Sequence, residues 1–147
     1  MTHQRPPGTD DATVEAVGKA SEAFEYVERV RGLLYSFHQL LGHADLTFGE
    51  AADALRDAGH GAHADRLETE VVGRNILDGR WTFQIVEEFD HVYYDPVRGA
   101  VKKLEADLMA GRRHVFEAEM KERRRSRGRD HHEARPAGTH HDTVDID

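Results

Sequence analysis

Apolar residues in the first third of the chain recur at steps of three and four positions. Between residues 20 and 41 they repeat over roughly six turns, as expected for an amphipathic helix. The stripe consists of Ala20, Ala23, Phe24, Val27, Val30, Leu34, Phe37 and Leu41. Asp10 or Asp11 can cap its start, and Gly42 is a typical stop. The pattern predicts a long first helix over about 12–42.

Three shorter helices are predicted in the middle of the chain. The sequence TFGE at 47–50 matches a capping box, which predicts a short helix over about 48–58. A second apolar stripe predicts a helix over about 62–77. The segment 81–94 follows an Asp-Gly pair, which is a hairpin signal, but its later apolar residues keep the helical period. We assign this segment to a helix.

The last predicted helix starts at Asp95 and Pro96, because Asp can cap a helix and Pro is favoured in its first turn. Its apolar stripe and helix-forming residues extend it over about 96–124. The fold prediction is an all-α protein, a small bundle of about five helices whose long first and last helices pack antiparallel. The last helix is longer than short neighbours can cover, so a homodimer is a further expectation.

Both ends of the chain are polar and lack apolar periodicity. Residues 1–10 and 126–147 are therefore predicted to be disordered, and residues 11–125 to form the helical domain. The chain has no cysteine and no long apolar run, which predicts a soluble, cytoplasmic protein without membrane contact. It also lacks nucleophile-elbow, phosphate-loop and H-E-x-x-H motifs, so we expect no catalytic activity.

The charge is unevenly distributed along the chain. Residues 1–111 carry 11 Lys and Arg against 20 Asp and Glu, net −9, whereas residues 112–135 carry 9 against 5, net +4. The sequence KERRRSRGR at 121–129 forms a basic arm suited to an anionic partner or to nonspecific polyanion contact. Its partner-binding candidates are Arg123, Arg124, Arg125 and Arg127. Without base-stacking aromatic residues nearby, sequence-specific nucleic-acid binding is not expected.

A metal site is the alternative hypothesis. Glu88 and His91 have the i,i+3 spacing with which one helix offers a carboxylate and an imidazole to a metal ion. His114 and Glu117 repeat the spacing in reverse order, and Glu25 or Glu28 could supply a bridging carboxylate. Carboxylate and imidazole ligands suit iron or manganese. The E-x-x-H motif occurs only once, however, and the usual meaning of such residues is a polar helix face.

Other candidates are weaker. His60 and His63 lie in a glycine-rich break, and Asp65 or Asp45 could complete a zinc site, although nothing in the sequence places them together. Histidines at 131, 132, 140 and 141 could bind metal weakly from the tail. The aromatic residues Phe37, Trp81, Phe83 and Phe89 could line a small-ligand pocket. The leading hypothesis is a non-catalytic helical scaffold or regulatory factor that acts through protein contacts, with no cofactor.

Overall fold

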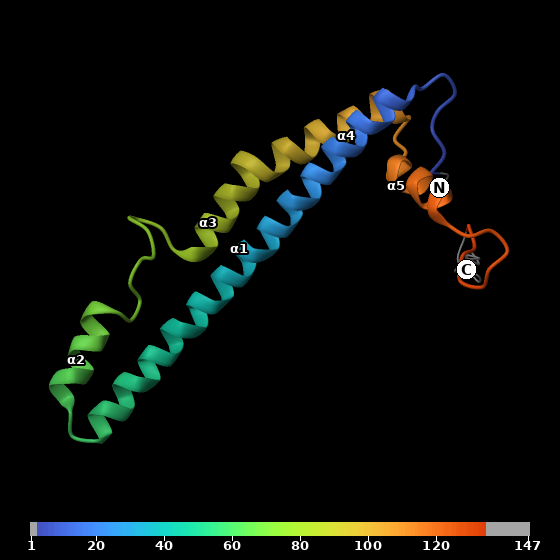
Figure 1. Ribbon diagram of the computed structural model, residues 1–147. Coiled ribbons are helices and arrows are strands. Elements are labelled where there is room, and N and C mark those ends of the chain that lie inside the picture. Colours follow the sequence, from blue (N-terminus) through green and yellow to red (C-terminus); the bar gives the residue numbers. More distant parts are fainter. Residues whose placement is uncertain (1–2, 135–147) are drawn as a thin grey trace, which may run out of the picture. The chain divides into compact units, whose positions relative to one another are not determined.

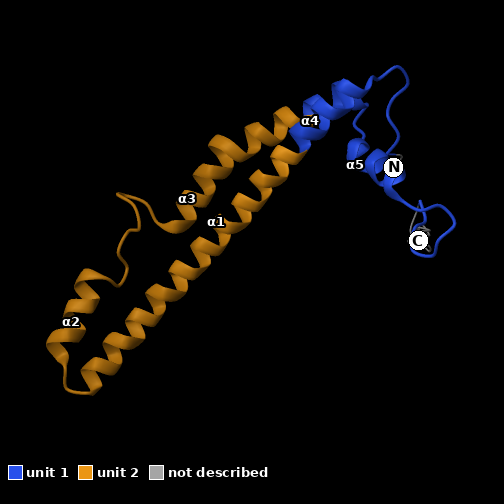
Figure 2. Cartoon of the chain, in the orientation of Figure 1, with its two compact units in different colours: residues 1–21, 103–147 blue, residues 22–102 orange. Residues whose placement is uncertain are grey.

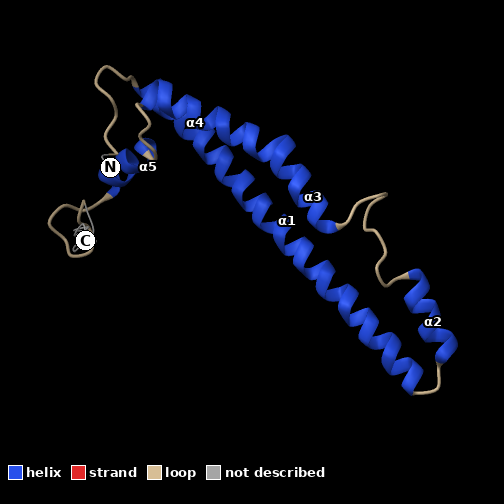
Figure 3. Ribbon diagram, turned by 180° about the vertical axis from the view of Figure 1, so that it is seen from behind, coloured by secondary structure: helices blue, strands red, loops and turns tan. Residues whose placement is uncertain are grey.

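The computed structural model describes residues 3–134, in which helices are joined by loops and the only β-type pairing is one isolated bridge between Leu77 and Arg80 (Figure 3). The all-α prediction is confirmed. The elements are α1 (Asp11–Asp57), α2 (Gly61–Glu70), α3 (Thr82–Phe89), the π-helical turn η1 (Asp90–Tyr94), α4 (Asp95–Met109) and α5 (Val115–Arg124). None of the helices in the described range is long and apolar enough to cross a membrane.

The chain divides into two compact units (Figure 2). Unit 1 consists of residues 1–21 and 103–147, and unit 2 of residues 22–102. The assignment of residues 11–125 to a single domain with disordered ends stays a prediction. Part of the predicted C-terminal tail, residues 135–147 with His140 and His141, lies outside the described residues.

The start of α1 is the predicted one. The Asp10 carboxylate accepts a hydrogen bond from the Thr13 backbone N–H at 2.7 Å, and hydrogen bonding from Thr13 holds the pKa of Asp10 below its usual range. The predicted end at Gly42 is wrong, because α1 continues to Asp57. A glycine inside a helix costs about 1 kcal/mol, which neighbouring contacts can offset. Thr47, expected to cap a separate helix, instead donates its hydroxyl to the His43 carbonyl at 2.9 Å.

The predicted helix start at Asp95 coincides with the first residue of α4, but Asp95 has helical backbone angles and does not cap the helix. The chain passes from α3 through η1 into α4 without leaving helical geometry, and the Asp95 N–H donates to the Asp90 carbonyl five residues earlier. Pro96 has no N–H, and its ring would collide with a carbonyl one turn back in a regular helix. A π-helical turn directly before Pro96 widens the helix where that collision would occur. Proline thus perturbs this helix without ending it.

The single last helix predicted over 96–124 is divided between α4 and α5. Ala110, Gly111 and His114 have positive φ angles of 51°, 71° and 57°, which interrupt the helix between Met109 and Val115. The Gly111 N–H donates to the Glu105 carbonyl at 3.0 Å, as is common where a helix ends in left-handed residues. Gly111, which lies inside the predicted helix over 96–124, is part of the helix end.

Unit 1 has a small apolar core between the first turns of α1, the end of α4 and α5. Its most buried members are Val14, Val17, Met109 and Val115, with Leu104 and Phe116 packed against them. Gly18 lies so close to Phe116 that a Cβ atom there would come within 2.8 Å of the Phe116 Cβ. The buried carboxylate of Glu105 accepts a hydrogen bond from the Ser21 hydroxyl at 3.0 Å.

In unit 2, α1 lies beside α3, η1 and the first part of α4 and runs antiparallel to them (Figure 1). Side-chain pairs show the antiparallel direction, because residues later in α1 pair with residues earlier in the segment formed by α3 and η1. His38 pairs with Thr82 at 2.6 Å, and Arg31 pairs with Asp90 at 2.7 Å. The antiparallel packing predicted for the first and last helices is confirmed for α4, whose Glu105 pairs with Ser21 near the start of α1. At the C-terminal end of α1, Arg56 forms ion pairs with Asp65 and Glu68 of α2.

Candidate interaction surface

One side of α1 in unit 2 carries a continuous row of exposed apolar side chains. Tyr26, Val30, Leu33, Phe37 and Leu40 are exposed and follow one another at steps of four and three residues; the half-buried Ala44 and the exposed Phe48 continue the row. This spacing places them along one helix face. Leu33 is 70% exposed and Leu40 68%, close to the exposure of polar surface residues. We call these seven residues the α1 strip.

The α1 strip is also poor in charge. The thirteen residues from Gly32 to Ala44 include no Asp, Glu, Lys or Arg, although a third of the whole chain is charged. A helix face that meets only water normally carries charged side chains, whereas the centre of a protein interface is depleted of them. The composition of the α1 strip is thus that of a contact surface.

A second face of the same helix is already covered. Phe24, Val27, Arg31, Leu34, His38 and Leu41 are half-buried and face α3, η1 and α4. Because this face and the α1 strip adjoin, α1 is apolar over about half of its circumference, and unit 2 covers only one part of it. Helices that are apolar on two adjacent faces are typical of bundles in which each helix has two neighbours.

An apolar cleft adjoins the C-terminal end of the α1 strip. It has a volume of about 480 Å³ and lies between α1, the 71–76 segment and the start of α3. Leu41, Ala44 and Phe48 form one wall, and Trp81 and Phe83 form the other. The two aromatic rings pack edge to face, with centroids 5.8 Å apart, yet Trp81 remains 59% exposed. Trp81 and Phe83 are two of the aromatic residues that the sequence suggested for a pocket.

The local backbone around the cleft is held by polar contacts. The Asp45 carboxylate accepts a hydrogen bond from the Gly73 N–H at 2.7 Å and so ties the connecting segment to α1. Gln84 reaches back to accept from the Trp81 N–H at 2.9 Å, which caps α3 where Trp81 offers no acceptor of its own. The first contact holds the connecting segment against α1, and the second fixes the backbone of Trp81 at the start of α3.

Across the covered face, unit 2 contains a polar cluster around Arg31. The Tyr94 hydroxyl donates to Glu28 at 2.8 Å, and this hydrogen bond, together with burial, raises the pKa of Tyr94. Arg31 lies over the Tyr94 ring, with its guanidinium carbon 4.6 Å from the centroid. The hydrogen bonds from Arg31 lower the pKa of Asp90. These polar side chains have their partners within the cluster, so a structural role accounts for them.

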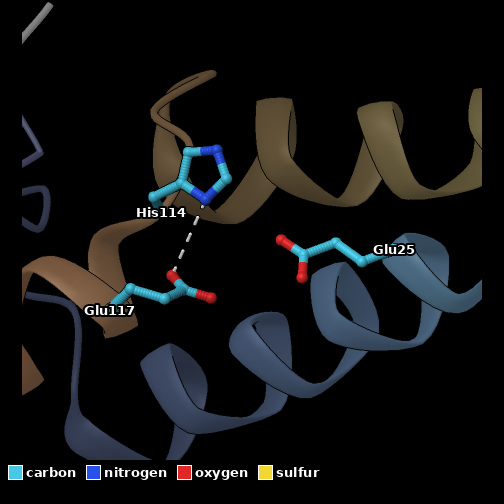
Figure 4. Close-up of side chains that lie close together, drawn as sticks. All are labelled: Glu25, His114 and Glu117. Atoms are coloured by element: carbon cyan, nitrogen blue, oxygen red, sulfur yellow. Dashed lines mark ion pairs between the residues drawn. The ribbon is translucent and has the colours of Figure 1, made fainter. Parts of the chain in front are cut away.

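The four predicted metal ligands fall in different units. Glu88 forms an ion pair with Arg80 at 2.6 Å, and His91 is exposed on η1, both in unit 2. His114 and Glu117 belong to unit 1, where the His114 Nδ1 and a Glu117 carboxylate oxygen are 4.0 Å apart (Figure 4). Glu25, also drawn in Figure 4, belongs to unit 2. The iron or manganese site stays a prediction.

The basic arm extends from the last turn of α5. Arg123 and Arg124 are exposed, whereas Arg125 donates two hydrogen bonds to Glu122, the second at 2.6 Å. Arg127 also reaches Glu122, at 3.4 Å. These hydrogen bonds, first that of Arg125, lower the pKa of Glu122. Two of the four candidate arginines are therefore engaged within the chain, and two are left pointing to solvent.

The α1 strip was not predicted from the sequence. Val30 and Phe37 fit the apolar stripe of the first predicted helix, whereas Leu33 and Leu40 lie outside that stripe. The available signal was the uncharged run from Gly32 to Ala44. Comparison with known proteins adds no relative: no family model, curated protein or solved structure matches the chain.

Proposed function

We propose that the protein is a non-catalytic helical protein that acts through protein–protein contacts, as a scaffold or regulatory factor. The observation that carries the proposal is the exposed α1 strip. Fourteen of the sixteen large apolar side chains exposed in the described chain belong to unit 2, where only four apolar residues are fully buried. Contiguous apolar surface of this kind marks sites of protein contact.

The basic arm is a secondary part of the proposal. Arg123 and Arg124 offer two exposed guanidinium groups to an anionic partner, and a positively charged segment of this kind accelerates association at low salt. Deletion of residues 121–147 is expected to abolish capture of that partner at low ionic strength. Capture that is equal with and without the arm would remove the arm from the proposal and leave the α1 strip unaffected.

Photo-cross-linking tests the role of the α1 strip. A photoreactive amino acid replaces Leu33 in one variant and Gln39 in a matched control; both positions are exposed on the same helix, but Gln39 lies off the strip. In the native cell extract, the Leu33 variant is expected to form adducts with a polypeptide and the Gln39 variant is not. Absence of adducts at Leu33, or equal adducts at both positions, contradicts the proposal.

A further inference from the structure

The α1 strip has a spacing that is nearly symmetric about its central residue, Phe37. Tyr26 and Phe48 lie eleven residues to either side of it, and Val30 and Ala44 lie seven residues to either side. Two identical helices that pack antiparallel across a twofold axis at Phe37 would therefore bring apolar residues together at every level. A C2 interface requires such self-complementarity, because the same surface is used by both subunits.

We infer that the α1 strip binds a second copy of this chain, with the two α1 helices antiparallel and Phe37 at the twofold axis. This inference rests on the proposed function and names its partner. In this arrangement Phe37 meets Phe37 of the partner subunit, and Val30 lies opposite the smaller Ala44 of the partner subunit. Two faces of α1 are then covered, one by α3, η1 and α4 and the other by the second copy.

The α1 strip alone is smaller than a stable dimer interface, so the contact must include further surface. The α1 strip from Tyr26 to Phe48 is about 33 Å long and about 10 Å wide, which offers roughly 300 Å². A stable dimer needs about 800 Å² from each subunit. The apolar cleft supplies additional surface, because Ala44 and Phe48 belong to both the α1 strip and the cleft wall. In the antiparallel register Tyr26 of the partner subunit lies opposite Phe48, at the mouth of the cleft beside Trp81.

The lack of charged residues in the middle of the α1 strip favours a second copy of the chain over other partners. Since the run from Gly32 to Ala44 carries no Asp, Glu, Lys or Arg, this part of the α1 strip offers no permanently charged group with which to select a charged partner. The chain's own terminal segment is a poor candidate: residues 135–147 include only Val144 and Ile146 as large apolar residues, too few to cover the row. An identical strip is equally long, equally apolar and present at the same concentration.

Single cysteine variants test this register, because the natural chain contains no cysteine. Under mild oxidation, Phe37→Cys is expected to form a disulfide-linked dimer, since residue 37 meets its own copy. Tyr26→Cys alone is expected to stay unlinked, whereas an equimolar mixture with Phe48→Cys is expected to cross-link. Gln39→Cys, exposed but off the strip, controls for random collision.

Three results would overturn the inference. They are cross-linking of Tyr26→Cys with itself, which indicates parallel helices; equal cross-linking of Gln39→Cys; and absence of dimer in every variant. A second readout needs no cysteine: Leu33→Glu should weaken dimerisation about 100-fold or more, because each dimer would bury two unpaired carboxylates. Its helical circular dichroism should be unchanged, since Leu33 is exposed. A purely monomeric chain that still forms Leu33 adducts with another protein refutes the second copy and retains the proposed function.

Discussion

Arg31 of α1 donates two parallel hydrogen bonds to Asp90 of η1, from Nε to Oδ1 at 2.7 Å and from Nη2 to Oδ2 at 2.8 Å. Such a bidentate pair is stronger than a single surface contact and fixes the relative position of two elements. Here it fixes the π-helical turn against α1, on the helix face next to the α1 strip. The exposed strip is therefore presented by a helix whose other face is firmly held.

The pair predicts a specific pH dependence. The hydrogen bonds from Arg31 lower the pKa of Asp90 from 3.8, so the stabilisation is present above pH 3.8 and is lost as the pH falls through the lower folded-state pKa. Asp90→Asn should lower the free energy of unfolding by about 1–2 kcal/mol at pH 7, and this deficit should shrink toward pH 2. Urea unfolding at several pH values measures it.

The matched control is Asp107→Asn, which removes the exposed i,i+4 pair between Lys103 and Asp107. Exposed pairs of this kind contribute about 0.3–0.5 kcal/mol, so the control should change stability by no more than that. If Asp90→Asn and Asp107→Asn have equal effects, the Arg31 pair does not hold η1.

Two glycines of α1 should respond to alanine in opposite directions. In Gly18→Ala the new Cβ would lie 2.8 Å from the Phe116 Cβ, which belongs to the stem of the side chain and cannot rotate away, so α5 must shift. We expect a loss of about 1–3 kcal/mol. Gly32 has no heavy atom within 4 Å of the corresponding position, so Gly32→Ala should stabilise the helix by up to about 1 kcal/mol. Thermal unfolding of both variants tests the packing of α5.

The end of α4 gives a third prediction. Ala110 has a φ of 51°, a left-handed conformation that is unfavourable for any residue with a Cβ. Ala110→Gly should therefore raise the free energy of unfolding by about 0.5–1 kcal/mol. Ala106→Gly, an exposed position inside α4, should instead lower it by about 1 kcal/mol. Equal destabilisation by both variants in denaturant unfolding would mean that α4 and α5 are one helix.

Metal analysis tests the alternative hypothesis. In the full chain, asparagine replaces the four tail histidines at 131, 132, 140 and 141, so that weak tail binding cannot contribute. We expect far less than one equivalent of iron or manganese in elemental analysis after dialysis against either metal. One retained equivalent that is lost in His114→Asn would contradict this expectation and support a metal site.

The helical class and the start of α1 could be predicted because they depend on local signals, namely apolar periodicity and the Asp10 cap. The helix end at Gly42 was wrong, because one glycine costs only about 1 kcal/mol and does not have to end a helix. Asp95 is the first residue of α4, but a π-helical turn precedes it in place of a cap. The break after Met109 had one signal, Gly111, but the apolar period continued past it and Ala110 normally favours a helix. Element types were thus more predictable than element boundaries.

The α1 strip escaped prediction for a related reason. Helical periodicity identifies apolar residues but assigns them to a single buried face, and it does not show which part of a wide apolar face the chain itself covers. Val30 and Phe37 fit the core stripe by spacing, yet they lie on its uncovered side. The covered and uncovered parts of this apolar face can be told apart only from the position of α3, η1 and α4, which pack against the face that carries Arg31. The sequence therefore shows that these residues are apolar, and the structure shows which of them are exposed.

Hydroxyl-radical footprinting of Leu40 and Leu46 tests the central claim most directly. Both leucines belong to α1 and have nearly equal exposure, 68% and 69%, but Leu40 is on the α1 strip and Leu46 lies off it. In the native cell extract, Leu40 should be labelled several-fold more slowly than Leu46, because a bound polypeptide covers the strip. Equal labelling of the two leucines would contradict the assignment of the α1 strip as a protein contact surface.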